Sequence, residues 1–387
     1  MKILLLAPHP FYQERGTPIA VDLLLTELSR RGDRVDVVTF REGAEKKYPG
    51  VVLHRIPRLP GMCGIRPGFS FKKLVCDVFM LAKALRLAAF GSYQVVHAVE
   101  ESVFMAMLIR LCLRTPYVFD MDSSMPQQMT EKFRILAAFS PILKWFEGRA
   151  IRHALAVVPV CDTLADIARP YAPRKLCLLR DVSLLTAMPS AVSGKLPPES
   201  AGLPHPCFLY IGNLEHYQGI DLLIESFALL LKNGLKASLL IAGGKETDIR
   251  HYQAKAAAAA LGQNARFLGP WPISRMAELF AVADVLVSPR IQGDNTPMKI
   301  YSYLQSGKPI IATNLPTHTQ VLTTAVAMLV PPTPETFAAG MRRLIEHTDQ
   351  GQALARRAKT LADAQYSFPV FERTVRELYE WIAHATT

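Results

Sequence analysis

Residues 285–314, VLVSPRIQGDNTPMKIYSYLQSGKPIIATN, predict the fold most directly. VLVS reads as a short buried strand, and the polar segment RIQGDNT follows it. Because Pro297 is tolerated in a first helical turn, PMKIYSYLQS predicts a helix that ends at Gly307, and PIIAT predicts the next buried strand. A loop between a parallel strand and a helix amino terminus is a common anion site, and Arg290 and Lys299 flank this one. The same pattern also fits an ordinary strand-loop-helix unit.

Length and composition indicate two globular domains. The chain has 387 residues, half of them hydrophobic, and single cores rarely grow beyond about 250–300 residues. No apolar run reaches the roughly 18 residues of a spanning helix, and the opening MKILLLAPHP is read as a first strand and not as a signal sequence. The six cysteines lack metal-site spacing, which predicts reduced thiols in a cytoplasmic protein.

The positive charge is concentrated in the first half of the chain. Residues 1–200 hold 27 basic and 18 acidic side chains, against 17 and 15 in residues 201–387. Between Arg55 and Arg86 there are seven basic residues and only one acidic residue, Asp77, with aromatic and aliphatic residues interleaved as far as Phe90. This combination favours an anionic membrane surface over nucleic acid, because no base-reading motif accompanies it. An amphipathic helix with a solvated basic face is the alternative interpretation.

Strands and helices alternate along both halves, which predicts an α/β protein with two doubly wound, Rossmann-like parallel sheets. We expect the amino-terminal domain at residues 1–182, a Ser-, Pro- and Gly-rich linker at 183–206, the carboxyl-terminal domain at 207–366, and a last helix at about 369–387 that packs back on the first domain. Two such domains are expected to face each other across a ligand cleft.

The loop after the first strand, PHPFYQERGTPIAVDLL, places Gly16 just before a helix. A glycine here lets the backbone approach a phosphate closely, and a tight turn is the alternative. The motif is not GxGxxG, and the second strand ends in VVTF without an acidic residue for a ribose. A dinucleotide-dependent dehydrogenase is therefore disfavoured.

Three blocks, in this order and spacing, resemble the retaining glycosyltransferases of family 4, which have the GT-B fold. They are ERGTPIAVDLLLTELSRRGDRVDVVTF, YIGNLEHYQGIDLLIESFALL and SPRIQGDNTPMKIYSYLQSGKPIIAT, and the resemblance covers nearly the whole chain. It implies transfer of a sugar from a nucleoside diphosphate sugar with retention of anomeric configuration. The donor would bind to the carboxyl domain and the acceptor to the amino domain, with no metal and no cofactor.

Several residues depart from the family pattern. The family commonly has an Arg after the first glycine of the carboxyl domain, here Gly212, and a Lys before the next glycine. This chain has Asn213 and Gln218 at those places. The paired glutamates of the family, eight positions apart, correspond here to Asp294 and Ser302, and a hydroxyl cannot accept two ribose hydroxyls as a carboxylate does.

Two interpretations follow from these departures. In the first, Arg290 and Lys299 replace the missing diphosphate ligands, and Asp294, Asn295 and Thr296 present polar groups to the sugar. In the second, the chain is a degenerate homologue that binds a nucleotide or a partner without catalysis. The polar loop GDNTP between two basic residues favours the first.

On the acceptor side, Glu100 and Glu101 follow the strand VVHAV, and we expect them to accept hydrogen bonds from acceptor hydroxyls. A helix amino-terminal pair is the alternative. His97, at the end of the same strand, is a candidate acceptor-side residue and equally a packing residue. Asp122 stands where the resemblance places a histidine that positions the sugar, so it is the candidate catalytic carboxylate.

The sequence therefore predicts a metal-independent retaining glycosyltransferase that uses a lipid-linked or polysaccharide acceptor in cell-envelope or exopolysaccharide synthesis. We expect it in the cytoplasm, peripheral on the inner face of the membrane, with no nucleic-acid partner. A non-catalytic nucleotide-binding subunit of a partner transferase is the alternative. An epimerase or phosphorylase of the same architecture is a third possibility, although no Lys is identifiable as a pyridoxal site.

Overall fold

The computed structural model describes residues 1–62, 64–65, 70–132, 139–187, 201–293 and 295–386. The chain forms two compact units, Met1–Arg180 with Phe371–Thr387 (unit 1) and Asp181–Val370 (unit 2). Asp294 and most of the predicted linker lie outside the described residues, as do Arg66 and Phe69 of the basic segment.

Unit 1 contains a six-stranded parallel sheet in the order β3-β2-β1-β4-β5-β6. Its strands are β1 (Lys2–Ala7), β2 (Arg34–Thr39), β3 (Val51–Arg55), β4 (Val95–Val99), β5 (Tyr117–Met121) and β6 (Ala156–Pro159). Strands β2 and β3 lie on one side of β1, and β4, β5 and β6 lie on the other, so the strand order changes direction between β1 and β4. The loops after these two strands therefore border the crevice where ligands bind in such folds. Strand β3 was missed by the sequence analysis, because this half-exposed edge strand has an apolar run of only Val51, Val52 and Leu53, followed by His54 and Arg55.

Helices cover both faces of this sheet. They are α1 (Gly16–Arg30), α2 (Phe71–Gly91), α3 (Val103–Leu113), α4 (Met125–Lys132), α5 (Ser140–His153), α6 (Asp162–Ala168) and α15 (Phe368–Thr386). The structure describes α4 as far as Lys132 and α5 from Ser140, and residues 133–138 lie outside the described ones.

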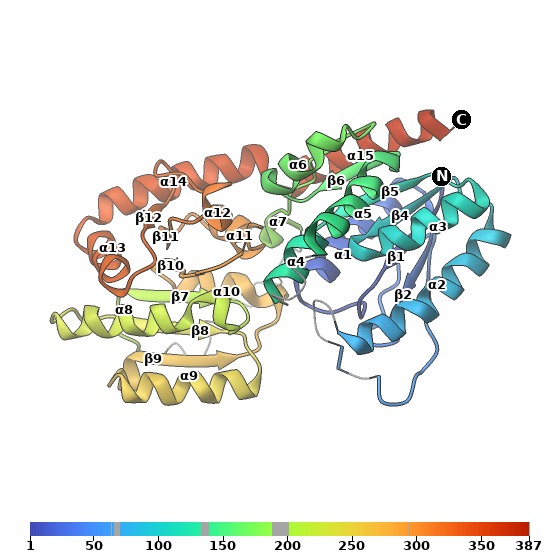
Figure 1. Cartoon of the computed structure of the whole chain (residues 1–387). Coiled ribbons are helices and arrows are strands. Elements are labelled where there is room, and N and C mark those ends of the chain that lie inside the picture. Colours follow the sequence, from blue (N-terminus) through green and yellow to red (C-terminus); the bar gives the residue numbers. More distant parts are fainter. Residues whose placement is uncertain (63, 66–69, 133–138, 188–200, 294, 387) are drawn as a thin grey trace. The chain divides into compact units, whose positions relative to one another are not determined.

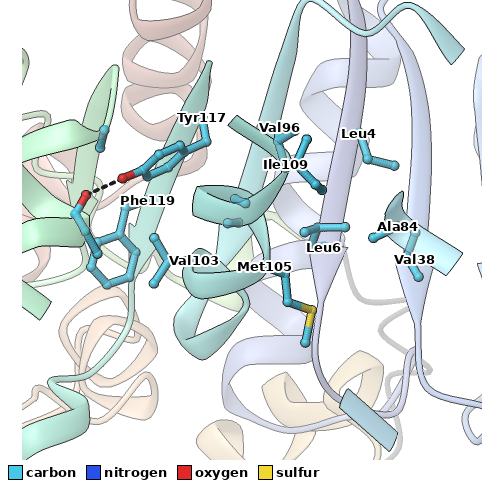
Figure 2. Packing of buried hydrophobic residues seen from close by; sticks show 14 of the residues in the cluster. Leu4, Leu6, Val38, Ala84, Val96, Val103, Met105, Ile109, Tyr117 and Phe119 are labelled. Carbon is cyan, nitrogen blue, oxygen red and sulfur yellow. Dashed lines mark hydrogen bonds between the residues drawn. The ribbon is translucent and has the colours of Figure 1, made fainter. Parts of the chain in front are cut away.

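One hydrophobic core lies between the sheet and the helices α2, α3 and α5. Met80, Ala106 and Ile151 from the three helices pack with Leu6 and Phe119 of the strands. The buried Tyr117 hydroxyl is satisfied, because it donates to the Ala150 carbonyl at 2.7 Å (Figure 2).

Helix α15 belongs to unit 1 from Phe371 on, although this part follows the whole of unit 2 in the sequence. The Tyr379 hydroxyl bonds to His97 Nδ1 at 2.9 Å, and Arg376 lies 3.4 Å from the buried carboxylate of Glu27 on α1. The last helix is therefore a structural part of the first sheet's unit.

Unit 2 contains a second six-stranded parallel sheet in the order β12-β11-β10-β7-β8-β9. Its strands are β7 (Cys207–Ile211), β8 (Ser238–Ala242), β9 (Ala265–Gly269), β10 (Val285–Ser288), β11 (Ile310–Thr313) and β12 (Met328–Val330). Its helices are α7 (Leu184–Ala187), α8 (Ile220–Lys232), α9 (Glu246–Ala258), α10 (Met276–Val282), α11 (Lys299–Gln305), α12 (Pro316–Thr319), α13 (Pro334–Glu346) and α14 (Thr348–Gln365). The predicted α/β class with two doubly wound sheets is confirmed (Figure 1).

Candidate functional site

In unit 2, the loops that follow β7, β8 and β10 pack backbone against backbone. A Cβ placed on Gly243 would lie 2.1 Å from the Gly212 carbonyl oxygen, and one on Gly219 would lie 2.0 Å from the carbonyl oxygen of Pro289. Both glycines have positive φ, of 108° and 74°. No side chain fits at these points, so glycine is required to bring residues of three loops together at the carboxyl edge of the sheet.

Arg290, directly after this edge, organises its own loop. It is 8% exposed. Its guanidinium donates to the Gln292 carbonyl at 2.7 Å and to the carbonyl and side-chain oxygens of Asn295, both at 3.3 Å. Its planar face lies 5.1 Å from the ring centroid of Tyr217. Arg290 thus fixes the conformation of the loop between β10 and α11.

Lys299 is the first residue of α11, which begins two residues after the predicted start at Pro297. Its ammonium lies 3.8 Å from the ring centroid of Tyr210 and donates to Gln218 Oε1 at 3.3 Å. Burial, and secondarily the charge of Arg290, hold the pKa of Lys299 well below its ordinary value. Among the described residues no carboxylate forms an ion pair with it, so an anionic ligand placed beside it would favour its charged form.

Asn213 and Gln218, two of the positions that depart from the family pattern, lie close to this lysine. Asn213 Nδ2 donates to the Tyr217 hydroxyl at 3.3 Å, and the Tyr210 hydroxyl donates to the Asn213 carbonyl at 2.6 Å. Gln218 accepts from Lys299, and a Cβ on Gly212 would lie 3.4 Å from Lys299 Nζ. The structure therefore brings the predicted residues Gly212, Asn213, Arg290 and Lys299 together.

Other predicted donor residues are placed differently. Asn295 lies in the loop, where its carbonyl also accepts from Thr317 at 2.9 Å. Thr296 is 6% exposed, and its hydroxyl has no hydrogen-bond partner among the described residues. Ser302 is fully buried on α11, and its hydroxyl accepts from the Leu184 backbone N–H at 3.0 Å. A ribose contact by Ser302 stays a prediction that this geometry does not favour.

The buried His318, which the sequence analysis missed, contacts the ends of β10 and β11 beside the loop between β10 and α11. His318 Nε2 lies 2.8 Å from the Ser288 hydroxyl, and its Nδ1 lies 3.0 Å from the Thr313 carbonyl oxygen. Burial lowers the pKa of His318 to about 3, so the ring is neutral. The Thr313 hydroxyl in turn donates to the Arg290 carbonyl at 2.5 Å. These hydrogen bonds hold the ends of β10 and β11 and the start of the loop together. In the sequence, only the position of Ser288 at the end of a predicted strand indicated them.

In unit 1, Gly16 is the first residue of α1 and is exposed. The preceding Arg15 makes no side-chain cap, and a Cβ on Gly16 would meet nothing within 4 Å. The amide groups at this helix start are therefore not capped by a side chain, as the predicted phosphate role requires.

Glu100 and Glu101 follow β4 and form ion pairs with Lys73 of α2. Lys73 Nζ pairs with Glu101 Oε1 and lies 4.0 Å from Glu100 Oε2. Burial opposes the charge of Lys73, but Glu101 and Glu100 outweigh it and raise the lysine pKa. Glu100 has a left-handed backbone (φ 51°), and burial together with Glu101 raises its pKa to about 7. The two glutamates are thus part of a charged cluster, which the sequence analysis missed although Lys73 lies within the basic segment.

His97 and Asp122 differ in how far they are enclosed. His97 is fully buried, and its nitrogens contact Tyr379 at 2.9 Å and Asp120 at 3.0 Å. Both ring nitrogens are engaged, so a direct contact between His97 and an acceptor stays a prediction that the geometry does not favour. Asp122 directly follows β5 and is half-buried. Ser123, its neighbour, lines a small cavity of 30 Å³ with Glu100 and Glu101.

Two kinds of feature are missing from the described residues, a metal-binding cluster and a membrane-spanning helix. No group of three or more His, Cys, Asp and Glu side chains there is arranged to hold a metal ion. No helix within the same residues has the length and apolar character needed to cross a bilayer.

Comparison with known proteins gives matches along both units. Residues 15–178 match the family described as Glycosyltransferase Family 4, and residues 199–361 match the family described as Glycosyl transferases group 1. The chain is a GT-B glycosyltransferase. The predicted resemblance is confirmed at this level, and membership of family 4 specifically stays a prediction.

The individual relatives are distant. D-rhamnosyltransferase WbpZ of Pseudomonas aeruginosa is 23% identical over 230 residues, and the match spans 58% of this chain and 58% of the relative, less than two thirds of its length. Sucrose-phosphate synthase of Thermosynechococcus elongatus has a TM-score of 0.81 at 18% identity and covers 99% of both chains. Anabaena HepE in complex with UDP-glucose has a TM-score of 0.73 at 16% identity, covering 98% of this chain and 99% of that one. These structural matches show the fold alone.

Proposed function

We propose that this glycosyltransferase is a retaining enzyme of family 4 that transfers a sugar from a nucleoside diphosphate sugar to a lipid-linked or polysaccharide acceptor. The observation that carries the proposal is the position of Lys299. Its ammonium donates to Gln218, the residue at the place where the resemblance puts a diphosphate-binding lysine. The positive charge beside Gln218 thus comes from Lys299 of α11, in place of the lysine that the family has in the loop after β7.

Within the proposed donor site, Lys299 acts as a point charge toward the departing diphosphate. Arg290 acts mainly through the loop that it holds, by way of Gln292 and Asn295. The unpartnered Thr296 hydroxyl supplies a hydrogen bond to the donor. No metal enters this scheme, because cationic side chains neutralise the leaving group.

On the acceptor side, Asp122 is proposed to stabilise the positive charge that develops at the sugar. Glu100 and Glu101 are proposed to accept hydrogen bonds from hydroxyl groups of the acceptor. The ion pair with Lys73 keeps Glu101 in one orientation, and the raised pKa of Glu100 adapts it to exchange a proton near neutral pH. D-rhamnosyltransferase and UDP-glucose complexes among the relatives support a nucleotide-sugar donor.

Membrane attachment is part of the proposal. Helix α2 holds the second part of the predicted segment, and Phe71, Lys72, Leu74 and Arg86 on it are exposed to solvent. This composition supports a cytoplasmic enzyme that binds peripherally to an anionic inner membrane face.

Thermal-shift and calorimetric measurements test donor binding. We expect one of the UDP-, GDP-, ADP- and CMP-sugars to raise the unfolding midpoint of the purified chain, because a ligand of the folded state stabilises it by mass action. Lys299→Ala should abolish most of this shift. Lys359→Ala removes a half-exposed lysine of α14, which lies 3.5 Å from Asp363, and is the matched control. A wild-type chain that binds none of the four donors contradicts the proposal.

The alternative is a nucleotide-binding homologue that supports a partner transferase. The burial of Ser302 against Leu184 favours it, since no ribose carboxylate stands at that position. Donor hydrolysis or transfer by the purified chain alone supports the enzyme, and donor binding with neither reaction supports the alternative.

A further inference from the structure

The outer surface of unit 1 contains a layer of three neighbouring helices, α2, α3 and α5. Their inner sides bury Met80, Ala106 and Ile151 in one core over the same face of the sheet. Figure 1 shows the three helices side by side on that face. Their outer sides therefore point in one direction and form one continuous surface, which we name the three-helix face.

Large apolar side chains are exposed on all three helices of this face. The most exposed are Phe71 (74%), Val78 (61%) and Phe90 (86%) on α2, Leu111 (80%) on α3, and Ile142 (55%) and Trp145 (58%) on α5. Single exposed apolar residues are ordinary, but a contiguous group of this kind marks a surface that another molecule or a membrane covers.

The charge on the same surface has one sign. Lys72, Arg86, Arg110, Lys144, Arg149 and Arg152 are exposed. The only acidic residues of the three helices are Asp77 and Glu147. Glu147 is 3% exposed and accepts from Ser124 and Met125, and Asp77 is partly buried, with Oδ1 enclosed. No carboxylate is exposed on these three helices, all of whose residues are described.

Helix α5 has the sharpest pattern. Ile142, Trp145, Phe146 and Arg149 have the spacing i, i+3, i+4 and i+7, which places them on one side of a helix. The Trp145 and Phe146 rings meet edge to face at 4.9 Å, and the Arg149 guanidinium lies 5.7 Å from the Trp145 ring. This stripe faces outward, because Glu147, Ala150 and Ile151 occupy the buried side.

We propose that the three-helix face is the membrane-docking surface of this protein, with the α5 stripe inserting into the interfacial layer of an anionic bilayer. Indole and phenyl rings prefer the interfacial layer, and the surrounding Lys and Arg side chains pair with anionic headgroups. Two copies of this face would repel each other through their like charges, and a nucleic acid would leave the aliphatic side chains without a partner. The inference rests on the peripheral attachment proposed above and extends it from α2 to α3 and α5.

Vesicle co-sedimentation of the full chain tests the docking surface. We expect stronger binding to vesicles of phosphatidylcholine with 30 mol% phosphatidylglycerol than to phosphatidylcholine alone, and weaker binding as salt rises. The double variant Trp145→Ser with Phe146→Ser should lose at least tenfold in partition coefficient. Val52→Ser removes an apolar residue on β3 that is 54% exposed and outside the face, and it should bind as the wild type does.

Three results would overturn the proposal. They are equal binding to neutral and anionic vesicles, unchanged binding of the α5 double variant, and a concentration-dependent dimer in sedimentation equilibrium that the double variant abolishes. The nucleotide-sugar thermal shift is measured on the same samples. A preserved thermal shift with lost vesicle binding concerns the docking surface alone, whereas vesicle binding without any thermal shift contradicts only the donor proposal.

Discussion

The ammonium group of Lys299 is enclosed by neutral groups, and this determines how it responds to a bound anion. Tyr210 and Gln218 contact it, and burial holds its pKa well below the ordinary value. A diphosphate placed beside it favours the charged form and raises that pKa.

Donor binding should therefore take up a proton at pH values between the free and bound pKa values of Lys299. Because binding and protonation are linked, the affinity for a nucleoside diphosphate sugar should fall as the pH rises through this range. Calorimetry in buffers of different ionisation enthalpy measures the proton uptake. Lys299→Ala should remove it and weaken binding by about 1.5–3 kcal/mol. Wild-type binding without proton uptake at any pH at which the chain stays folded would contradict this assignment.

The glycines of unit 2 permit a second prediction. Gly243→Ala should lower the free energy of unfolding of unit 2 by roughly 2 kcal/mol or more, since its Cβ would collide with the Gly212 carbonyl at 2.1 Å. Gly32→Ala is the control: this glycine also has positive φ (77°), but a Cβ there meets nothing within 4 Å. It should cost only about 1 kcal/mol, the strain of the backbone alone. Urea unfolding compares the two, and equal losses would refute the steric argument.

At the scale of the element, α2 carries a carboxyl group that prefers to be neutral. Burial, with a contribution from Glu101, raises the pKa of Asp77 to about 8. In the unfolded chain the same group ionises near pH 4. Between these values the folded state holds a proton that the unfolded state lacks, so this group's contribution to stability is complete below about pH 4 and is lost as the pH rises toward 8.

Asp77→Asn should remove this pH dependence. We expect the stability of the variant relative to the wild type to increase from pH 4 to pH 8, as measured by the urea midpoint of the first unfolding transition that reports on α2. Asp166→Asn changes an exposed carboxylate and is the control. A difference between variant and wild type that stays constant across this pH range would show that Asp77 is not protonated in the folded state.

The elements also show how much could be predicted from the sequence. Buried strands such as β1 and β10 were predictable, because continuous apolar runs between turn residues identify them. The edge strand β3 was not, since its apolar run of Val51, Val52 and Leu53 is short, is followed by His54 and Arg55 and is half-exposed. Local spacing places Arg290 and Lys299 on either side of one loop. The same spacing could not predict the contact between Lys299 and Gln218, because that contact depends on the pairing of β7 with β10 in the sheet.

The same limit applies to the acceptor side. Glu100 and Glu101 were predictable candidates, because polar residues after a parallel strand lie at the edge of the sheet. Their ion pairs with Lys73 were not, since the lysine comes from a helix two elements earlier and its sequence neighbours read as a solvated basic face. The full enclosure of His97 depends on α15, which follows it by more than 250 residues.

At the scale of the whole molecule, the contact between Tyr379 and His97 ties the last described helix to the first sheet. Tyr379→Phe should destabilise unit 1 by about 1–3 kcal/mol, because it leaves a buried ring nitrogen without a partner. Tyr171→Phe is the matched control, since its hydroxyl makes only a long, exposed contact of 3.4 Å. Circular-dichroism melts would measure both, and equal midpoints for the two variants would argue against a structural role for the His97 contact.

The return of α15 to unit 1 also has a consequence for biosynthesis. Unit 2 is a continuous segment of chain, Asp181–Val370, so it can complete its core without residues from beyond that segment. Unit 1 cannot, because Phe371–Thr387 is synthesised only after all of unit 2. We therefore expect unit 1, whose synthesis begins first, to finish folding only after all of unit 2 has been synthesised, because until then His97 lacks the contact with Tyr379 of α15.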